Sequence, residues 1–351
     1  MWSDKIDASS IYTFNIIIGS SCNWKCPSCI QTDNNTFSKN IDIELFCSNL
    51  EQYIHEKNLI DKISRFVLWG GEPLLYLPAV EKLLANFARY ATYKPTRVVS
   101  NGSLLTSDNY HVFNKHRTHF NLSYHDGQLS DACWEQALKI EKLVVSSLVH
   151  HKRLSWDEMY NKWSLLYEEY GRCIPWYVFP IIPTESVPQQ YWLTRDDVDQ
   201  YFENLHHYLE RLDNVFYNTA FHGLIYEFSQ RGREKVATNP CFNNNTISID
   251  LEGNRYMCHH DCSSKYIVGN IFKTTKQSKT IPIFNDVDYM LITPPEGCQT
   301  CSAYNYCLGG CYRDMNKSVT CYYKHKVVEL LNKIKTDFSN YFEKRYLDLI
   351  L

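Results

Sequence analysis

The spacing of its cysteines constrains this chain more than any other feature of the sequence. Of the 14 cysteines, the first group is Cys22, Cys26 and Cys29, which form Cys-x3-Cys-x2-Cys. The sequence does not open on a basic region followed by an apolar stretch, so no signal peptide is predicted and a cytoplasmic location is expected. Thiols stay reduced there, which favours cysteines as ligands of a metal or cluster over disulfides.

Strand-like and helix-like segments alternate over the first two thirds of the chain. The apolar, β-branched run at residues 11–18 is typical of a strand buried on both faces. Repeated alternation predicts an α/β fold with a parallel sheet, and six such units would form an open or partial (β/α)6 TIM-like barrel. The expected strands are 11–18, 65–69, 96–100, 119–124, 143–149 and 174–182, and the expected helices are 42–58, 78–90, 131–142 and 155–170.

The pattern changes near residue 238. Residues 241–321 are rich in Cys, Asn, Gly and Tyr, and short strands are expected at 246–250 and 255–257. A segment with so little apolar periodicity builds no large core of its own, and small modules of this kind usually need a metal. Residues 326–344 are amphipathic and predict a closing helix.

The first cysteine group directly follows the first predicted strand. Three thiolates on one short loop can hold three corners of a [4Fe–4S] cube, which leaves the fourth iron open to a cofactor or substrate. The alternatives are a zinc site completed by a distant residue, or three unrelated buried thiols.

A second motif, Gly70-Gly71-Glu72-Pro73, follows the second predicted strand. The carboxyl end of a parallel strand is where α/β folds bind their ligands. Two glycines let the backbone approach a ligand closely, and Glu72 offers an acceptor for an ammonium group. An ordinary Gly-Gly turn with an acidic cap is the alternative.

Together the two motifs resemble those of the radical S-adenosylmethionine (SAM) superfamily. The resemblance covers roughly residues 11–183 and implies a six-stranded partial barrel with a SAM-binding [4Fe–4S] cluster on the first cysteine group. It also implies SAM contacts from Gly70, Gly71, Glu72 and Pro73. By position in the family, Ser100 and Asn101 at the end of the third strand would lie near SAM, and Ser123 at the end of the fourth would contact the ribose.

One residue departs from this family pattern. The family usually places an aromatic residue before the third cysteine, near the adenine, but Ser28 stands there in this chain. Trp24, inside the same loop, is a candidate for the missing apolar surface.

The order and spacing of seven later cysteines resemble those of the SPASM extension of radical SAM enzymes, and the pattern includes a glycine, Gly253, that four residues separate from Cys258. The resemblance implies two auxiliary [4Fe–4S] clusters, and so three clusters in the protein. Auxiliary cluster I would use Cys241, Cys258 and Cys311, with Cys262 as a candidate fourth ligand and His259 as a candidate base beside it. Auxiliary cluster II would use Cys298, Cys301, Cys307 and Cys321. A zinc ribbon built from Cys-x2-Cys pairs is the alternative.

The predicted organisation has four parts. Residues 1–10 are an extension, 11–235 the barrel with linking helices, 236–325 the SPASM domain and 326–351 the C-terminal helix. Outside the two groups, Cys47 and Cys133 lie in helical patterns and are expected to be core residues, and a packing role is expected for Cys173.

The resemblance implies reductive cleavage of SAM to a 5′-deoxyadenosyl radical and oxidative modification of a ribosomal peptide by a thioether or carbon–carbon crosslink. A small-molecule dehydrogenase or epimerase is an alternative. Formylglycine formation ranks lower, because His259 stands where sulfatase maturases have an aspartate. A non-catalytic iron–sulfur carrier or zinc scaffold is the alternative from another class. An external electron donor such as flavodoxin or ferredoxin is implied, whereas a net charge of −3 and short apolar runs favour neither nucleic acid nor membrane as a partner.

Overall fold

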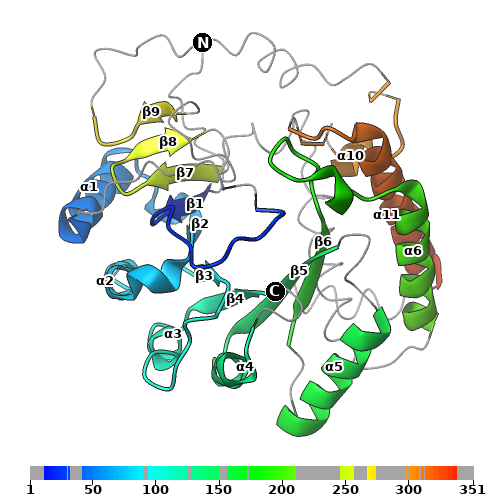
Figure 1. Cartoon of the computed structure of the whole chain (residues 1–351). Helices are drawn as coiled ribbons and strands as arrows, with labels where there is room; N and C mark the ends of the chain where they lie inside the picture. The colour runs from blue at the N-terminus through cyan, green and yellow to red at the C-terminus, as the bar shows by residue number, and fades with distance from the viewer. Residues whose placement is uncertain are drawn as a thin grey trace. The chain divides into compact units, whose positions relative to one another are not determined.

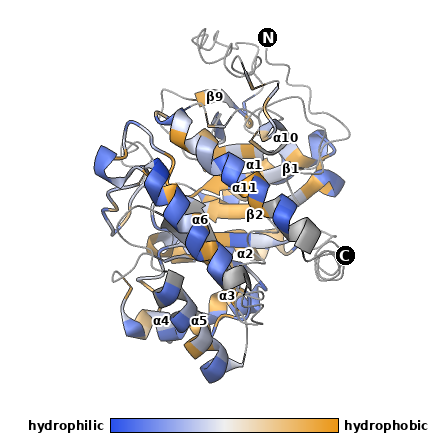
Figure 2. Ribbon diagram, turned by 90° about the vertical axis from the view of Figure 1, so that its right-hand side faces the viewer, coloured by the Kyte–Doolittle hydropathy of each residue, from blue (hydrophilic) through white to orange (hydrophobic). Residues whose placement is uncertain are grey.

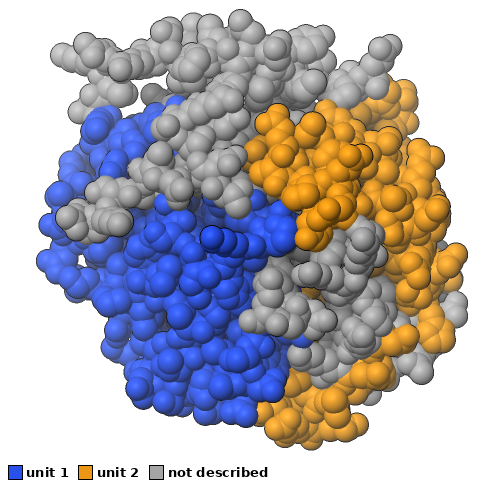
Figure 3. Space-filling view, viewed as in Figure 1, with its two compact units in different colours: residues 1–144, 240–284 blue, residues 145–239, 285–351 orange. Residues whose placement is uncertain are grey.

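The protein is described here from a computed structural model. The structure describes residues 12–29, 31, 42–89, 94–124, 129–149, 156–171, 174–210, 246–256, 267–273, 297–298, 300–307, 310–311 and 313–337. The chain forms two compact units, coloured separately in Figure 3: unit 1 is 1–144 with 240–284, and unit 2 is 145–239 with 285–351. No helix in the described ranges is both long and apolar enough to cross a membrane.

Unit 1 is built on a mixed sheet whose strands run in the order β4-β3-β2-β1-β7-β8-β9. The first four strands pair in parallel, and β7 pairs in parallel with the other edge of β1. The short strands β8 and β9 follow β7 in antiparallel fashion. The strands are β1 (Tyr12–Ile17), β2 (Ile63–Trp69), β3 (Thr96–Ser100), β4 (His119–Ser123), β7 (Thr246–Asp250), β8 (Asn254–Tyr256) and β9 (Ile267–Asn270).

Four α-helices of unit 1 follow its parallel strands, and Figure 1 shows α1, α2 and α3 along one side of the sheet. They are α1 (Ile43–Glu56), α2 (Leu77–Phe87), α3 (His111–Lys115) and α4 (Asp131–Leu138), with short 3-10 turns η1 (Ile60–Lys62) and η2 (Pro73–Tyr76). The core lies where apolar stripes of the helices meet the strands. Phe66 of β2 and Phe87 of α2 are both fully buried and stack with ring centroids 4.2 Å apart. Figure 2 shows the strands near β2 as mainly hydrophobic, whereas the helices carry many hydrophilic residues.

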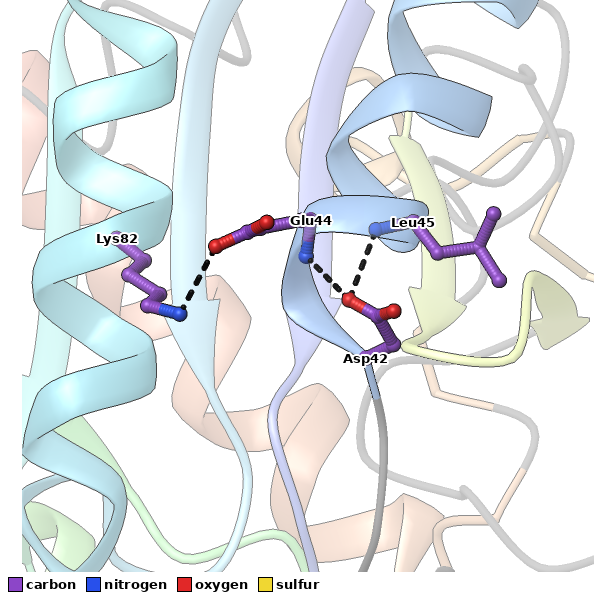
Figure 4. A network of polar contacts seen from close by, with 4 residues as sticks. All are labelled: Asp42, Glu44, Leu45 and Lys82. Carbon is purple, nitrogen blue, oxygen red and sulfur yellow. Dashed lines mark hydrogen bonds and ion pairs between the residues drawn. The ribbon is translucent and has the colours of Figure 1, made fainter.

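Helix α1 has a defined beginning, shown in Figure 4. The Oδ1 atom of Asp42 accepts hydrogen bonds from the backbone N–H groups of Glu44 (3.0 Å) and Leu45 (3.1 Å). This N-cap satisfies two of the donors that a helix leaves unpaired in its first turn. Glu44 also pairs with Lys82 of α2 at 3.1 Å, and both of these side chains are exposed.

Unit 2 contains a parallel pair of strands and, within its described residues, four α-helices. Its elements are β5 (Leu143–Val149), α5 (Trp156–Tyr170), β6 (Trp176–Pro180), η3 (Gln189–Tyr191), α6 (Arg195–Glu210), α10 (Tyr304–Cys307) and α11 (Lys317–Asp337), and the unit boundary falls inside β5. Helices α6 and α11 pack through Tyr323, whose ring lies 5.3 Å from that of Phe202. On the same pair of helices, Asp199 accepts a hydrogen bond from the Tyr322 hydroxyl (2.6 Å) and pairs with Lys326 (2.8 Å).

The predicted α/β class with a parallel sheet is confirmed, and every predicted strand is present to within a few residues. The closing helix was placed wrongly: it begins at Lys317, not at 326. Its first turns carry Lys317, Ser318 and Thr320, so the apolar periodicity that predicted the helix begins only later. Helix α4 also ends at Leu138 rather than 142. The prediction did not include β9, α3 or α6 as separate elements.

Candidate functional site

The loop after β1 brings the first cysteine group together. Cys29 donates its backbone N–H to the carbonyl of Cys26 (3.0 Å), which turns the loop, and the Trp24 N–H points at the Cys22 sulfur (3.4 Å). Burial, and after it the nearby Cys29 and Cys22, raise the pKa of the Cys26 thiol to about 11. Three sulfurs that resist ionising side by side become favourable ligands once a cationic cluster replaces their protons. The donor set therefore fits an iron–sulfur cluster.

The two glycines after β2 let this cysteine loop lie directly against the end of the strand. Gly70 and Gly71 have positive φ angles of 105° and 51°, a region that glycine adopts without strain. A Cβ on Gly71 would collide with the backbone carbonyl of Ser21, next to Cys22. The Glu72 N–H donates to that same carbonyl at 2.8 Å. The motif thus joins the ends of β1 and β2.

The side chain of Glu72 is buried in the protein interior. Only 1% of the residue is exposed, and Pro73 begins η2 directly behind it. Its Oε1 accepts from the Leu74 N–H (2.9 Å) and the Ser100 hydroxyl (2.6 Å), and its Oε2 accepts from the Asn101 N–H (2.8 Å). Burial raises the pKa of the Glu72 carboxyl, and the three hydrogen bonds oppose that rise.

A carboxylate has about four acceptor positions, and the described contacts of Glu72 fill three of them. The carboxylate therefore ties the end of β2 to the end of β3, and its Oε2 has one hydrogen-bond partner among the described residues. The predicted role of Glu72 as an ammonium acceptor stays a prediction.

The predicted SAM residues of the next strands meet at the same carboxyl edge. Ser100 ends β3 and Asn101 follows it, and Ser123 ends β4 one residue beyond Leu122, the partner of Ser100. The Asn101 amide lies against the cysteine loop: its Nδ2 donates to Asn23 Oδ1 (3.0 Å) and is 3.9 Å from the Cys22 sulfur. The structure thus brings the first cysteine group, the Gly-Gly-Glu-Pro motif and Asn101 together within unit 1.

Unit 2 gathers the four cysteines of predicted auxiliary cluster II. The Cys301 N–H donates to the Cys298 carbonyl (3.1 Å), Cys307 ends α10, and Cys321 lies in the second turn of α11. The pKa of Cys321 is raised by burial and then by Cys307, Cys298, Asp314 and Cys301, so all four thiols share one electrostatic environment. Four thiolates so close together repel one another, and cationic iron would relieve that repulsion. The set therefore fits the ligands of an iron–sulfur cluster.

His325 lies beside this second group. Its Nε2 is 3.4 Å from the Cys301 sulfur and its Nδ1 is 3.5 Å from the Ser302 hydroxyl. His325 follows Cys321 by four residues on α11, so both side chains occupy one face of the helix. Sequence reasoning missed His325 because it placed the start of the helix after Cys321.

Several predicted site residues lie outside the part of the chain that the structure describes. They are Cys241, Cys258, His259 and Cys262, and Cys173 lies outside it as well. Within the described ranges, no group of three or more His, Cys, Asp or Glu side chains converges on a point where a single metal ion would sit. A cube offers a separate iron to each thiolate, so its ligands need not converge on one point.

The two ungrouped cysteines on described helices differ. Cys47 on α1 is buried, as predicted. Cys133 on α4 was expected in the core, but it is only partly buried and its thiol donates to the Ser103 carbonyl (3.3 Å). The predicted core role of Cys133 is therefore wrong.

Comparisons with known proteins agree with this arrangement. A family model described as a 4Fe-4S single cluster domain matches residues 14–149, which include the first cysteine group and Gly70-Gly71-Glu72-Pro73. No curated protein sequence matches the chain. The structure is similar to that of anSMEcpe, an anaerobic sulfatase-maturating enzyme, solved with bound AdoMet (SAM): the TM-score is 0.67 and the identity 17%, over 93% of this chain and 96% of the other. The fold is that of the radical SAM enzymes.

Two further solved structures show the same fold. The structure of anSMEcpe with bound AdoMet and the Cp18Cys peptide gives a TM-score of 0.66 at 18% identity, over 92% of this chain and 99% of that one. Streptococcus suis SuiB bound to the precursor peptide SuiA gives 0.61 at 15% identity, over 88% of this chain and 73% of that one. The radical SAM fold expected from the motifs is confirmed.

Proposed function

We propose that the protein is a radical SAM enzyme that oxidatively modifies a peptide. The observation that carries the proposal is the meeting of Cys22, Cys26 and Cys29 with Gly70-Gly71-Glu72 at the carboxyl ends of β1 and β2. Cys22, Cys26 and Cys29 would hold a [4Fe–4S] cluster there, which would supply the single electron for reductive cleavage of SAM into methionine and a 5′-deoxyadenosyl radical.

The chain's own residues would bind and orient SAM. The glycines at 70 and 71 give close access to backbone, and Oε2 of Glu72 is the proposed acceptor for the SAM ammonium. Ser123, which ends β4 on the same edge, is the proposed ribose contact. Trp24 is partly buried in the cysteine loop. It is the proposed apolar surface for the adenine, because this chain has Ser28 where the family usually has an aromatic residue.

The experiment that tests this activity measures 5′-deoxyadenosine. Dithionite-reduced, anaerobically reconstituted protein is expected to release it slowly from SAM even without substrate. A variant with Cys22, Cys26 and Cys29 changed to Ala is expected to release none, whereas a Cys47→Ala control keeps the activity because Cys47 is buried in α1. Equal release by the triple variant and the parent protein would refute the proposal.

The peptide substrate is supported by the solved structures of SuiB with its precursor peptide SuiA and of anSMEcpe with the Cp18Cys peptide. We propose a thioether or carbon–carbon crosslink in a ribosomal peptide. The similarity to anSMEcpe over nearly its whole length favours formylglycine formation as a second candidate.

Mass spectrometry of a cysteine-containing peptide after turnover separates these two reactions. Loss of two hydrogens with the sulfur retained indicates a crosslink. Exchange of the cysteine sulfur for an aldehyde oxygen indicates formylglycine. A peptide that stays unchanged, with 5′-deoxyadenosine released no faster than in its absence, would count against both peptide reactions and leave the small-molecule dehydrogenase or epimerase as the alternative.

We propose two auxiliary clusters: cluster II on Cys298, Cys301, Cys307 and Cys321, and cluster I on Cys241, Cys258 and Cys311. Cluster I would keep an open iron, with His259 as the base that takes the proton released during product formation. Cys262→Ala is then expected to leave the iron content unchanged. His259→Ala is expected to keep 5′-deoxyadenosine release while product is lost. Loss of iron in the Cys262 variant would instead make Cys262 the fourth ligand. An external donor such as flavodoxin or ferredoxin would deliver the electrons.

A further inference from the structure

Three side chains beside the first cysteine group form a closed ring of hydrogen bonds. Asn101 Nδ2 donates to Asn23 Oδ1 (3.0 Å), Asn23 Nδ2 donates to the Ser103 hydroxyl (2.8 Å), and that hydroxyl donates to Asn101 Oδ1 (2.7 Å). The ring joins the cysteine loop after β1 to the turn after β3. Neither Asn23 nor Ser103 was among the site residues predicted from the sequence.

The ring fixes which way the Asn101 amide faces. Besides the hydroxyl, the backbone N–H of Ser103 donates to Asn101 Oδ1 (2.9 Å), and a backbone N–H can only donate. The oxygen must therefore face Ser103, and the NH2 group must face the cysteine loop. Asn101 is 7% exposed, so water competes little for this arrangement.

The fixed NH2 group has two hydrogens and two neighbours. One hydrogen is taken by Asn23 Oδ1, and the Cys22 sulfur is 3.9 Å from the same nitrogen. The Trp24 N–H approaches that sulfur from within the loop at 3.4 Å. Hydrogen bonds to cluster sulfurs help to set the reduction potential of an iron–sulfur cluster, because they stabilise its more negative, reduced form.

We propose that Asn101, held in orientation by Ser103 and Asn23, is a positioning residue that donates to the Cys22 thiolate and raises the reduction potential of the SAM-binding cluster. This rests on the proposed cluster at Cys22, Cys26 and Cys29. It also gives the amide of Asn101 a partner in the protein, distinct from the contact with SAM that its place after β3 suggests.

The test is a redox titration of the reconstituted holoprotein followed by electron paramagnetic resonance. The signal of the SAM-binding cluster is the one missing from the variant with Cys22, Cys26 and Cys29 changed to Ala. Ser103→Ala removes the hydroxyl from the ring without changing charge, and Ser103→Thr restores a hydroxyl. Asn101→Leu removes the donor itself. Asn114→Leu is the matched control. Asn114 holds another loop of unit 1 in the same way, because its Nδ2 donates to the Lys139 carbonyl (3.0 Å) and its Oδ1 accepts from the Glu141 N–H (2.9 Å).

The expected result is a more negative midpoint potential in Asn101→Leu, a smaller shift in the same direction in Ser103→Ala, and the parent value in Ser103→Thr and Asn114→Leu. Full iron content with an unchanged midpoint in both Asn101→Leu and Ser103→Ala would overturn the inference. A parent protein that contains no such signal would instead overturn the proposed function, so the two failures are distinguishable.

Discussion

At the scale of single residues, the most constrained side chain of the site is Glu72. Its carboxylate accepts three hydrogen bonds while almost fully buried. In Glu72→Gln one oxygen becomes an NH2 group that faces another donor. We expect a loss of about 1–3 kcal/mol in the free energy of unfolding, measured by urea denaturation, together with weaker SAM binding. Unchanged values for both would show that the three hydrogen bonds contribute nothing.

The lowered pKa of His119 makes the stability of the fold depend on pH. Burial, followed by the positive charges of Lys142, Arg97 and Arg65, lowers the pKa of His119 from 6.5 to about 4. The unfolded chain therefore takes up this proton at a higher pH than the folded chain, so stability is lost as the pH falls from about 6.5 to about 4. Because solvent screens this half-buried ring, we expect His119→Gln to recover on the order of 1–2 kcal/mol at pH 5 relative to pH 7. Parallel urea curves for both proteins at the two pH values check this. An equal loss in parent and variant would contradict it.

The motif residues were predictable and their supporting residues were not. Cys22, Cys26, Cys29 and Glu72 stand out by type and spacing. Asn23 and Ser103 are ordinary polar residues, and only the approach of the turn after β3 to the loop after β1 gives them a role. The hydrogen bonds of the buried Glu72 carboxylate were not predictable either, because its partner Ser100 lies on another strand.

At the scale of elements, the beginning of α1 can be tested directly. Asp42→Ala removes a side chain that accepts two backbone N–H groups, and we expect it to cost about 1 kcal/mol of stability. Asp42→Ser keeps an acceptor and is expected to recover most of that loss. Lys82→Met, which breaks only the exposed pair with Glu44, is expected to cost about 0–1 kcal/mol. A larger effect at Lys82 than at Asp42 would reverse this assignment.

Regular elements followed the sequence where apolar periodicity was strong. β3, β5 and β7 have the predicted bounds. The prediction failed where polar residues form the helix, as in the first turns of α11, because packing and not periodicity decides there. Cys321 consequently lies within a helix rather than before one, which is what brings His325 to its side.

At the scale of the whole molecule, metal content is the decisive measurement. Three cubes predict about twelve iron and twelve sulfide per chain in anaerobically reconstituted protein. Changing Cys22, Cys26 and Cys29 together to Ala is expected to remove about a third of the iron, since only one cube depends on them. Stoichiometric zinc with little iron in anaerobically purified protein would contradict the entire assignment.

The order of strands is the part of the fold that periodicity could not predict. The segment 236–325 was expected to form one domain, and that boundary stays a prediction. The pairing of β7 with β1 nevertheless places 240–284 in the same compact unit as the first strands. Pairing partners so far apart in sequence are set by the assembled sheet and leave no local signal.

This pairing also has a consequence for how the protein is made. β1 lies between β2 and β7, and Thr13 pairs with Thr246. During synthesis one edge of β1 stays without its partner until most of the chain has left the ribosome, and contacts between such distant segments form slowly. An unpaired, apolar strand edge is a site of aggregation. A nascent chain halted before β7 would therefore carry the cysteine loop after β1 on an incomplete sheet, in a form prone to aggregation.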